Sequence, residues 1–472
     1  MTETTPEKYA IGMIGLGVMG RNLLLNLAEH GFPAAGYDRD PAKLEALRAE
    51  AGALPVRAVA DVAQLVALLQ RPRAVILLVP AGAAVDAVLA ELAEHLDQGD
   101  LIIDAGNSHF KDTERREAEL GQFHLDFLGT GISGGEEGAR RGASLMPGGS
   151  AAAFERVRPA LEAVAARVGG EPCVAHLGPG AAGHFVKMTH NGIEYGLMEL
   201  LAESYDLMKR GLGLSNQELH EVYAGWDAGE LNGYLMEITA AIVVYPDGAS
   251  GRELLDAVAP VARQKGTGMW TSQAAMDLQA PVPTIDAAVT QRNLSALEAE
   301  RRGASLSRPT PPFQGDRAAF LRQLRQALYG AMILTYAQGF ALLRIASDAY
   351  HYELDLATVA RIWRGGCIIR AAALERFRAA FQHKPHLRNL ILDEALGAEL
   401  QACEAGLRAV AGAAVAMALP APAFLASLAY LDSYRSPWLP ANLLQAQRDC
   451  FGAHTYERVD AKGPFHTEWL KP

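Results

Sequence analysis

The sequence has few cysteines, and their positions argue against two classes of protein. Cys173, Cys367, Cys403 and Cys450 are scattered along a chain of 472 residues. Structural zinc sites and disulfide-stabilised domains need cysteines at characteristic short spacings, which are missing here. The sequence therefore predicts no metal site and a protein of the reducing cytoplasm.

Long apolar runs are also missing. The run from Ala74 to Val79 is too short to cross a bilayer, and the run from Val410 to Leu419 ends at Pro420. The first residues, Met1 to Lys8, are polar and lack the apolar region of a signal peptide. We therefore expect no membrane-spanning segment and a cytoplasmic location.

Positive charge is in short supply. Lysine and arginine number 43 against 54 aspartates and glutamates, which gives a formal net charge of −11. Nucleic acid is not an expected partner, because proteins that bind it usually present an excess of basic residues. Half of the residues are hydrophobic, and the chain is too long for one core, so two or three domains are expected.

The first third of the chain alternates short apolar segments with helical ones. Strands are expected at Ala10 to Ile14, Ala34 to Tyr37, Ala74 to Val79, Leu101 to Asp104 and Leu125 to Leu128. Strands that are apolar throughout and separated by helices are typical of a parallel sheet with both faces covered. The pattern predicts an α/β doubly wound sheet of the Rossmann type.

A glycine-rich turn follows the first strand directly. It reads Gly15-Leu16-Gly17-Val18-Met19-Gly20 and opens a helix, and Asp38 stands at the end of the next strand. A glycine turn without a ligand is the simpler alternative, since such turns are common. The strand, turn, helix and distal acid together are typical of dinucleotide binding, so we predict a Rossmann-like domain for a dinucleotide over residues 1–178.

Asp38 also bears on which dinucleotide is bound. A carboxylate at this position accepts hydrogen bonds from the ribose hydroxyls of NAD and repels the 2′-phosphate of NADP. The neighbouring Arg39 could hold that phosphate, whereas Asp40 adds a second negative charge. Two acids against one arginine favour NAD and leave NADP open.

Two loops are expected at the carboxyl ends of strands, where open α/β sheets bind ligands. They are Asp104-Ala105-Gly106-Asn107-Ser108 and Gly129-Thr130-Gly131-Ile132-Ser133-Gly134-Gly135. The small residues of the second loop allow backbone N–H groups to face an anion. The same composition would also suit a flexible loop without a ligand.

Helical periodicity replaces the strand pattern after Pro179 and continues to about Tyr434. We therefore predict an all-helical domain over residues 179–434 and a C-terminal tail over residues 435–472. The tail is rich in aromatic residues and too short to bury them alone. It is expected to dock on another surface, of its own chain or of a partner.

The helix expected from Ala182 carries polar side chains where a core helix has apolar ones. Five of them share one face, at i, i+3, i+4, i+7 and i+8: Lys187, His190, Asn191, Glu194 and Tyr195. A solvated face with a Lys–Glu pair is the alternative. Glycines along the helix favour the close approach of a ligand, so we interpret this face as the floor of an active site. Lys265 and Arg292 are either surface charges or further ligand contacts, and the glycines close to Lys265 favour a ligand contact.

The chain resembles the decarboxylating 6-phosphogluconate dehydrogenase family over essentially its whole length. The resemblance is carried by the glycine turn and by the segments Ser133 to Arg140, Ser144 to Gly149, His184 to Tyr195, Gln264 to Gly268, Trp363 to Arg370 and Gln447 to Tyr456. It implies oxidation and decarboxylation of 6-phosphogluconate to ribulose 5-phosphate and CO2 in the pentose phosphate pathway and in gluconate utilization. It also implies a homodimer whose active site is shared between subunits.

The resemblance assigns roles to individual residues. Lys187 is implied as the general base and Glu194 as the acid. The implied substrate site is Asn107, Ser133, Gly134, Gly135, His190, Asn191, Tyr195, Lys265, Thr267, Arg292, Arg448 and His454, the last two from the other subunit. The cofactor site is Gly15, Leu16, Gly17, Val18, Met19, Gly20, Asp38, Arg39, Asp40, Pro80, Ala81, Gly82 and Asn107.

The family uses NADP, usually with Asn-Arg-Thr or Asn-Arg-Ser at the Asp38 position and a lysine at the Pro80 position. Both differences keep NAD open beside NADP. Two other functions are weighed against this one. A β-hydroxyacid dehydrogenase of the hydroxyisobutyrate type would lack the long helical domain and the tail. A nucleotide-sensing protein without catalysis would leave the Lys–Glu face without a task.

Overall fold

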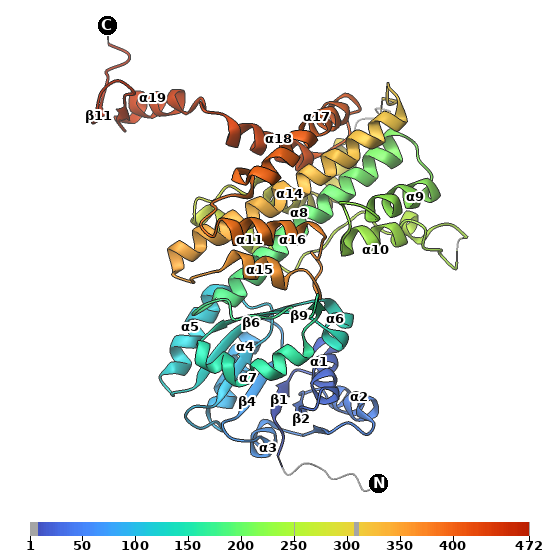
Figure 1. Cartoon of the computed structure of the whole chain (residues 1–472), viewed down its shortest axis with the longest axis vertical. Coiled ribbons are helices and arrows are strands. Elements are labelled where there is room, and N and C mark those ends of the chain that lie inside the picture. Colours follow the sequence, from blue (N-terminus) through green and yellow to red (C-terminus); the bar gives the residue numbers. More distant parts are fainter. Residues whose placement is uncertain (1–7, 250, 306–310, 472) are drawn as a thin grey trace.

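The computed structural model describes residues 8–249, 251–305 and 311–471. An N-terminal domain built on a sheet lies below a larger helical domain, and the C-terminal segment extends away from both (Figure 1). The fold class predicted from the sequence is confirmed, whereas the division at residues 178 and 434 stays a prediction.

The N-terminal sheet has seven strands in the order β3-β2-β1-β4-β5-β6-β7. All neighbouring strands are parallel except β6 and β7, which are antiparallel. The strands are β1 (Ile11–Ile14), β2 (Ala34–Tyr37), β3 (Val56–Ala58), β4 (Ala74–Leu77), β5 (Leu101–Asp104), β6 (Asp126–Ser133) and β7 (Ser144–Gly149).

Helices cover both faces of this sheet, as the apolar strands predict. One face packs against α1, α2, α6 and α7, and the other against α3, α4 and α5. Their bounds are α1 (Val18–Glu29), α2 (Pro41–Ala51), α3 (Val62–Leu68), α4 (Ala83–Ala93), α5 (Phe110–Gly121), α6 (Gly135–Arg141) and α7 (Ala151–Val164). A small hairpin, β8 (Arg167–Val168) and β9 (Glu171–Pro172), follows.

The segment expected as a glycine-rich loop after Leu128 is mostly strand. β6 continues to Ser133 and pairs with β7 from Leu128 to Ser133, so only Gly134 and Gly135 turn away. Glycine disfavours strands, which explains the wrong prediction. The glycines are needed here because α8 lies on this strand: a Cβ on Gly131 would stand 2.2 Å from Cβ of Lys187.

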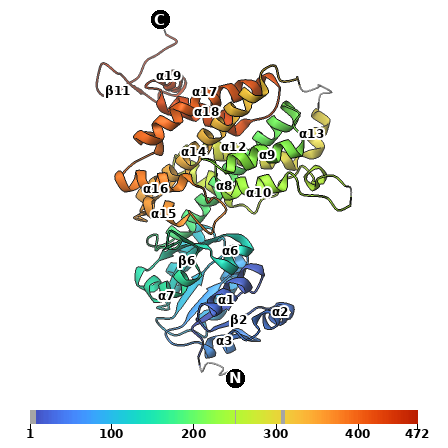
Figure 2. The same cartoon turned by 45° about the vertical axis from the view of Figure 1, so that its right-hand side comes forward.

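The second domain is helical and is organised by two long helices that pack side by side, α8 (Ala182–Asp206) and α14 (Arg317–Tyr350) (Figure 2). The first half of α8 rests on β6 and β7, so this helix joins the two domains. The other elements are η1 (Leu207–Gly211), α9 (Asn216–Asp227), α10 (Tyr234–Ile242), η2 (Leu254–Ala257), α11 (Thr267–Asp277), α12 (Pro283–Ala296), α13 (Glu298–Ala304), α15 (Leu356–Ile362), α16 (Ala373–His383), η3 (Leu390–Leu392), α17 (Glu394–Ala416) and α18 (Pro422–Arg435).

Helix α14 is a long apolar segment, although the sequence analysis expected none. Within the described ranges it is long and apolar enough to cross a membrane by length and composition, which inspection of short apolar runs missed. However, 83% of its most apolar window is buried inside the protein. It packs against α8 and α17, so it is a core helix of the second domain.

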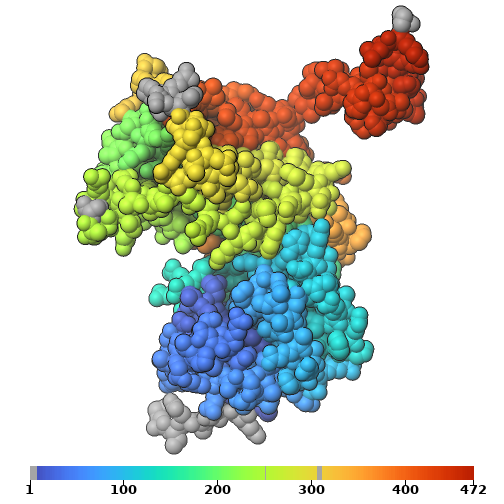
Figure 3. All heavy atoms as spheres, turned by 180° about the vertical axis from the view of Figure 1, so that it is seen from behind, coloured from blue at the N-terminus to red at the C-terminus, as the bar shows by residue number. Residues whose placement is uncertain are grey.

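The C-terminal segment forms a small unit of its own. It consists of α19 (Ala441–Gly452) and a hairpin of β10 (Tyr456–Glu457) and β11 (Pro464–Phe465). Asp449, fully buried, ties the unit together: its carboxylate accepts hydrogen bonds from the Thr455 and Thr467 backbone N–H groups and from the Trp469 indole. Seen from behind, the unit stands clear of the helical domain (Figure 3). Of the two expected alternatives, docking on a surface of the same chain is therefore not observed.

Candidate active site

A cavity of about 990 Å³ lies where the two domains meet. Its walls come from the loops after β4 and β5, the end of β6, helix α8, and the region around α11 and α12. The predicted site residues that line it are Met19, Pro80, Ala81, Gly82, Asn107, Ser133, Gly134, Gly135, Lys187, Asn191, Glu194, Tyr195, Lys265, Thr267 and Arg292. Residues predicted from separate parts of the sequence are thus brought to one chamber.

Helix α8 supplies a hydrogen-bonded network to the floor of this cavity. The Lys187 Nζ donates to Asn191 Oδ1 at 2.9 Å, and His190 Nδ1 lies 3.1 Å from the same oxygen. His190 Nε2 lies 3.2 Å from the Ser133 hydroxyl at the end of β6. Since an amide oxygen only accepts, we assign the proton of His190 to Nδ1, with Ser133 donating to Nε2. His190 therefore supports the floor from below, whereas Lys187 and Asn191 line the cavity.

Burial shifts the pKa values of three side chains on this floor. It lowers the pKa of Lys187 from its ordinary value, against the opposing effect of the Glu194 carboxylate. Burial, helped by the charge of Lys187, lowers the pKa of His190 well below its usual range, so the imidazole is neutral. Burial also raises the pKa of Glu194. A more easily deprotonated amine and a more easily protonated acid on one helix face are what acid–base catalysis near neutrality needs.

Cations line the cavity where α11 and α12 border it. The Arg292 guanidinium carbon stands 3.4 Å from the centroid of the Tyr195 ring, a cation–π contact between α12 and α8. Lys265 and Thr267 reach the cavity from the start of α11. This arrangement can hold a phosphate through charge and hydroxyl groups.

The glycine turn between β1 and α1 fits a dinucleotide. Gly15 has φ of +97°, and a Cβ there would stand 2.4 Å from the Leu78 carbonyl oxygen. A Cβ on Gly17 would instead enter open space at the first residues of α1. This is the space a pyrophosphate needs in order to reach the backbone N–H groups of the helix N-terminus. The residues present therefore suit the cofactor that the sequence predicts.

Asp38 and Asp40, the two acids that favoured NAD, both have local partners. The Asp38 carboxylate accepts hydrogen bonds from the backbone N–H groups of Leu16 and Asp40, at 2.8 and 2.9 Å. Lys43 forms an ion pair with it at 3.1 Å. The Asp40 carboxylate caps α2 by accepting from Ala42 N–H. Lys43 was missed by the sequence analysis, and its spacing of five residues from Asp38 was the available signal.

Arg448 and His454 are not near these residues within the chain. Both lie in the C-terminal unit, where Arg448 donates to Gln445 and His454 meets Phe451 edge to face. The cavity also has walls that the sequence analysis did not assign to the site: His109, Asp112, Arg263, Gln264, Trp270 and Ile368. His109 and Trp270 meet edge to face with ring centroids 5.1 Å apart and so connect the two domains.

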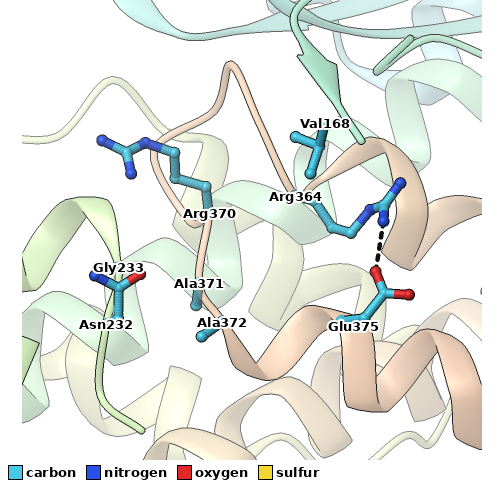
Figure 4. Close-up of a pocket in the computed structure, with 8 residues that line it drawn as sticks. All are labelled: Val168, Asn232, Gly233, Arg364, Arg370, Ala371, Ala372 and Glu375. Atoms are coloured by element: carbon cyan, nitrogen blue, oxygen red, sulfur yellow. Dashed lines mark hydrogen bonds and ion pairs between the residues drawn. The ribbon is translucent and has the colours of Figure 1, made fainter. Parts of the chain in front are cut away.

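A smaller cavity of about 310 Å³ lies near the start of α16 (Figure 4). It is lined by Val168, Asn232, Gly233, Arg364, Arg370, Ala371, Ala372 and Glu375. Its arginines are already paired, Arg364 with Glu375 and Arg370 with Glu237. It contains none of the predicted site residues, so the larger cavity is the candidate active site.

Known proteins match the chain over nearly its whole length. Residues 10–178 match the family described as NAD binding domain of 6-phosphogluconate dehydrogenase, and residues 183–469 match 6-phosphogluconate dehydrogenase, C-terminal domain. The NADP(+)-dependent, decarboxylating 6-phosphogluconate dehydrogenase of Bacillus subtilis is 49% identical over 468 residues, covering 98% of this chain and 100% of that one. The decarboxylating enzyme of Synechococcus elongatus is 50% identical over 468 residues, covering 97% and 99%.

A solved structure agrees with these relatives. The 6-phosphogluconate dehydrogenase of Plasmodium falciparum superposes with a TM-score of 0.95 at 42% identity, covering 98% of this chain and 100% of that one. That protein was solved in its apo form, with its cofactor NADP+ and with its substrate 6-phosphogluconate. Both domains are therefore those of one family, and this chain belongs to the 6-phosphogluconate dehydrogenases.

Proposed function

We propose that the chain oxidatively decarboxylates 6-phosphogluconate to ribulose 5-phosphate and CO2 while reducing NADP+, as a cytoplasmic enzyme of the pentose phosphate pathway. The observation that carries the proposal is the floor of the large cavity. Lys187 is 7% exposed there, its pKa is lowered by burial, and Glu194 lies two turns away on the same helix face. The described cysteines are all free, which supports a reducing location.

The residues divide the chemistry between them. Neutral Lys187 takes the proton from the C3 hydroxyl of the substrate. NADP+, when bound, supplies the acceptor for the hydride that leaves C3. The Lys187 ammonium then stabilises the negative charge that develops on the C3 oxygen as CO2 departs. Glu194, whose pKa is raised by burial, delivers a proton to the carbon that becomes C1 of ribulose 5-phosphate.

The substrate phosphate is assigned to the cationic side of the cavity. Lys265, Arg292 and the Tyr195 hydroxyl would hold it from this chain. We assign Arg448 and His454 to the same phosphate end, contributed by the tail of a second subunit. Support comes from the exposed apolar surface of the tail, where Phe451 is 75% exposed, because a monomer rarely leaves such a patch uncovered.

The proposed cofactor is NADP+, because the Asp38 charge is offset by Lys43 and the Asp40 carboxylate is used as a helix cap. Arg39, exposed beside them, is assigned to the 2′-phosphate with Lys43. We expect the double substitution Asp38→Asn with Asp40→Thr to raise the ratio of kcat/KM for NADP over NAD. The gain is up to roughly fivefold, since an exposed charge pair contributes about 1 kcal/mol at most.

Steady-state kinetics with both cofactors measure this ratio. The matched control is Glu45→Gln on α2, the helix that Asp40 caps. It removes a negative charge from the exposed side of this helix, where Glu45 pairs with Arg48. An unchanged or lowered ratio in the double variant would mean that neither acid opposes the 2′-phosphate.

The function itself is tested by one assay. Purified protein is given 6-phosphogluconate with NADP+ and NAD+ in parallel, and reduced nucleotide and CO2 are both measured. We expect one CO2 for each reduced nucleotide, with NADP+ the better cofactor. Reduced nucleotide without CO2 would indicate a non-decarboxylating hydroxyacid dehydrogenase, and no turnover with either cofactor would reject the proposal.

A further inference from the structure

Arg116 is a fully buried guanidinium that none of the proposed catalytic steps uses. It lies on α5 behind the wall of the large cavity, with 0% of its side chain exposed. Its Nε donates to Asp86 at 2.7 Å, and its Nη2 donates to the Gly82 carbonyl oxygen at 3.1 Å. Its Nη1 donates to the Ser108 hydroxyl at 3.1 Å and lies 3.4 Å from Asp104. One side chain thus contacts two separate loops.

Both loops form walls of the active site. Pro80, Ala81 and Gly82 follow β4, and Ala105, Gly106 and Asn107 follow β5. The loops are neighbours because β4 and β5 pair in parallel, with Leu77 opposite Asp104 at their carboxyl ends. The last backbone hydrogen bond between them joins the Ala105 N–H to the Leu77 carbonyl oxygen at 2.9 Å, so the strand pairing itself does not extend to Gly82 and Asn107.

The loop after β5 is also held in place by Asp104, the last residue of that strand. The Asp104 carboxylate accepts from Gly106 N–H at 3.1 Å and from the Ser108 hydroxyl at 2.6 Å. Asn107, between these two residues, is exposed to the cavity. Asp104 fixes the ends of the loop, and Arg116 connects that assembly to Gly82 on the other loop.

We propose that Arg116 is a positioning residue that sets the distance between the cofactor-side loop at Gly82 and the substrate-side loop at Asn107. A planar guanidinium with several N–H groups suits this task, because it donates in three directions at once. A lysine ammonium keeps the charge next to Asp86 and Asp104 but is a single point that cannot reach all the acceptors. Small shifts between bound partners reduce turnover strongly, so the expected loss is roughly ten- to hundredfold.

The chain offers a matched control at the next residue. Arg115 donates to the same Asp86 at 2.9 Å, but its side chain is 44% exposed. It also pairs with acids on its own helix, such as Glu119. Arg115→Lys changes the same chemistry on the same helix without touching either loop. It should leave kcat, KM and cofactor affinity close to those of the wild type.

The experiment compares Arg116→Lys with Arg115→Lys. The inference rests on the proposed function, so the dissociation constant of NADP+ is measured by calorimetry without substrate, beside kcat, both KM values and thermal unfolding. We expect Arg116→Lys to weaken NADP+ binding, raise the KM for 6-phosphogluconate and lower kcat together. Failure of the wild type to turn over 6-phosphogluconate would reject the function, whereas the NADP+ comparison would still judge Arg116.

Ser108→Ala covers the case in which Arg116→Lys does not fold. This change removes the contact of Arg116 with the Ser108 hydroxyl and leaves its contacts with Gly82 and Asp104, so the KM for 6-phosphogluconate and kcat should change more than the NADP+ dissociation constant. Two results would overturn the proposal. One is an Arg116→Lys protein that is folded and kinetically the same as Arg115→Lys. The other is a Ser108→Ala protein with wild-type kinetics.

Discussion

Replacing Lys187 with methionine is expected to lower kcat by at least about 10²-fold while substrate binding stays within roughly tenfold, because a general base contributes at least this much. Methionine has an unbranched apolar side chain one atom shorter than that of lysine, which suits the buried position. Asn191 Oδ1 keeps its contact with His190 in the variant, so the floor of the cavity retains part of its network. Steady-state kinetics with 6-phosphogluconate and NADP+ measure the loss.

Lys265→Met is the control for charge alone. It removes an amine from the cationic side of the same cavity, so it should raise the KM for 6-phosphogluconate more than it lowers kcat.

The pH dependence of the wild type gives a second test of Lys187. Lys187 must be neutral to act, so kcat/KM of the wild type should rise with pH through the lowered pKa of this amine. The residual kcat/KM of Lys187→Met should not rise with pH in this range. Wild-type turnover in the variant would rule out Lys187 as the general base.

Mixing two inactive variants is expected to restore about a quarter of the wild-type activity if the tail completes the site of a partner subunit. The variants are Lys187→Ala, defective in the cavity floor, and Arg448→Ala, defective in the tail. Random exchange of subunits makes half of the dimers mixed. In a mixed dimer with crossed tails, one site carries both defects and the other carries neither. Half of the sites in half of the dimers are therefore intact.

Activity is measured after exchange under mild conditions, and exchange is followed independently with two differently tagged chains. Each variant taken through the same procedure alone is the control and should stay inactive. If exchange is complete and activity does not return, every site must draw Arg448 from its own chain. The tail would then have to fold back onto the cavity from its extended position (Figure 1).

Much of the fold was predictable because its signals are local. β2 and β5 begin and end where the apolar segments predicted, and the glycine turn lies between β1 and α1 as expected. The face of α8 was predictable for the same reason. A helix places residues at i, i+3, i+4 and i+7 together whatever surrounds it, so the spacing alone groups Lys187, His190, Asn191 and Glu194.

The sequence by itself therefore determined the Rossmann pattern, the helical domain after it and the polar face of α8. Only the tertiary structure decided which partners those residues have. It paired Asp38 with Lys43, placed Arg116 between two loops, and made a strand of Gly129–Ser133 by pairing it with β7. Such contacts join residues that are distant in the chain or depend on the side-chain direction that packing selects. Local propensity does not encode them, because their energy exists only once the chain has brought both partners together.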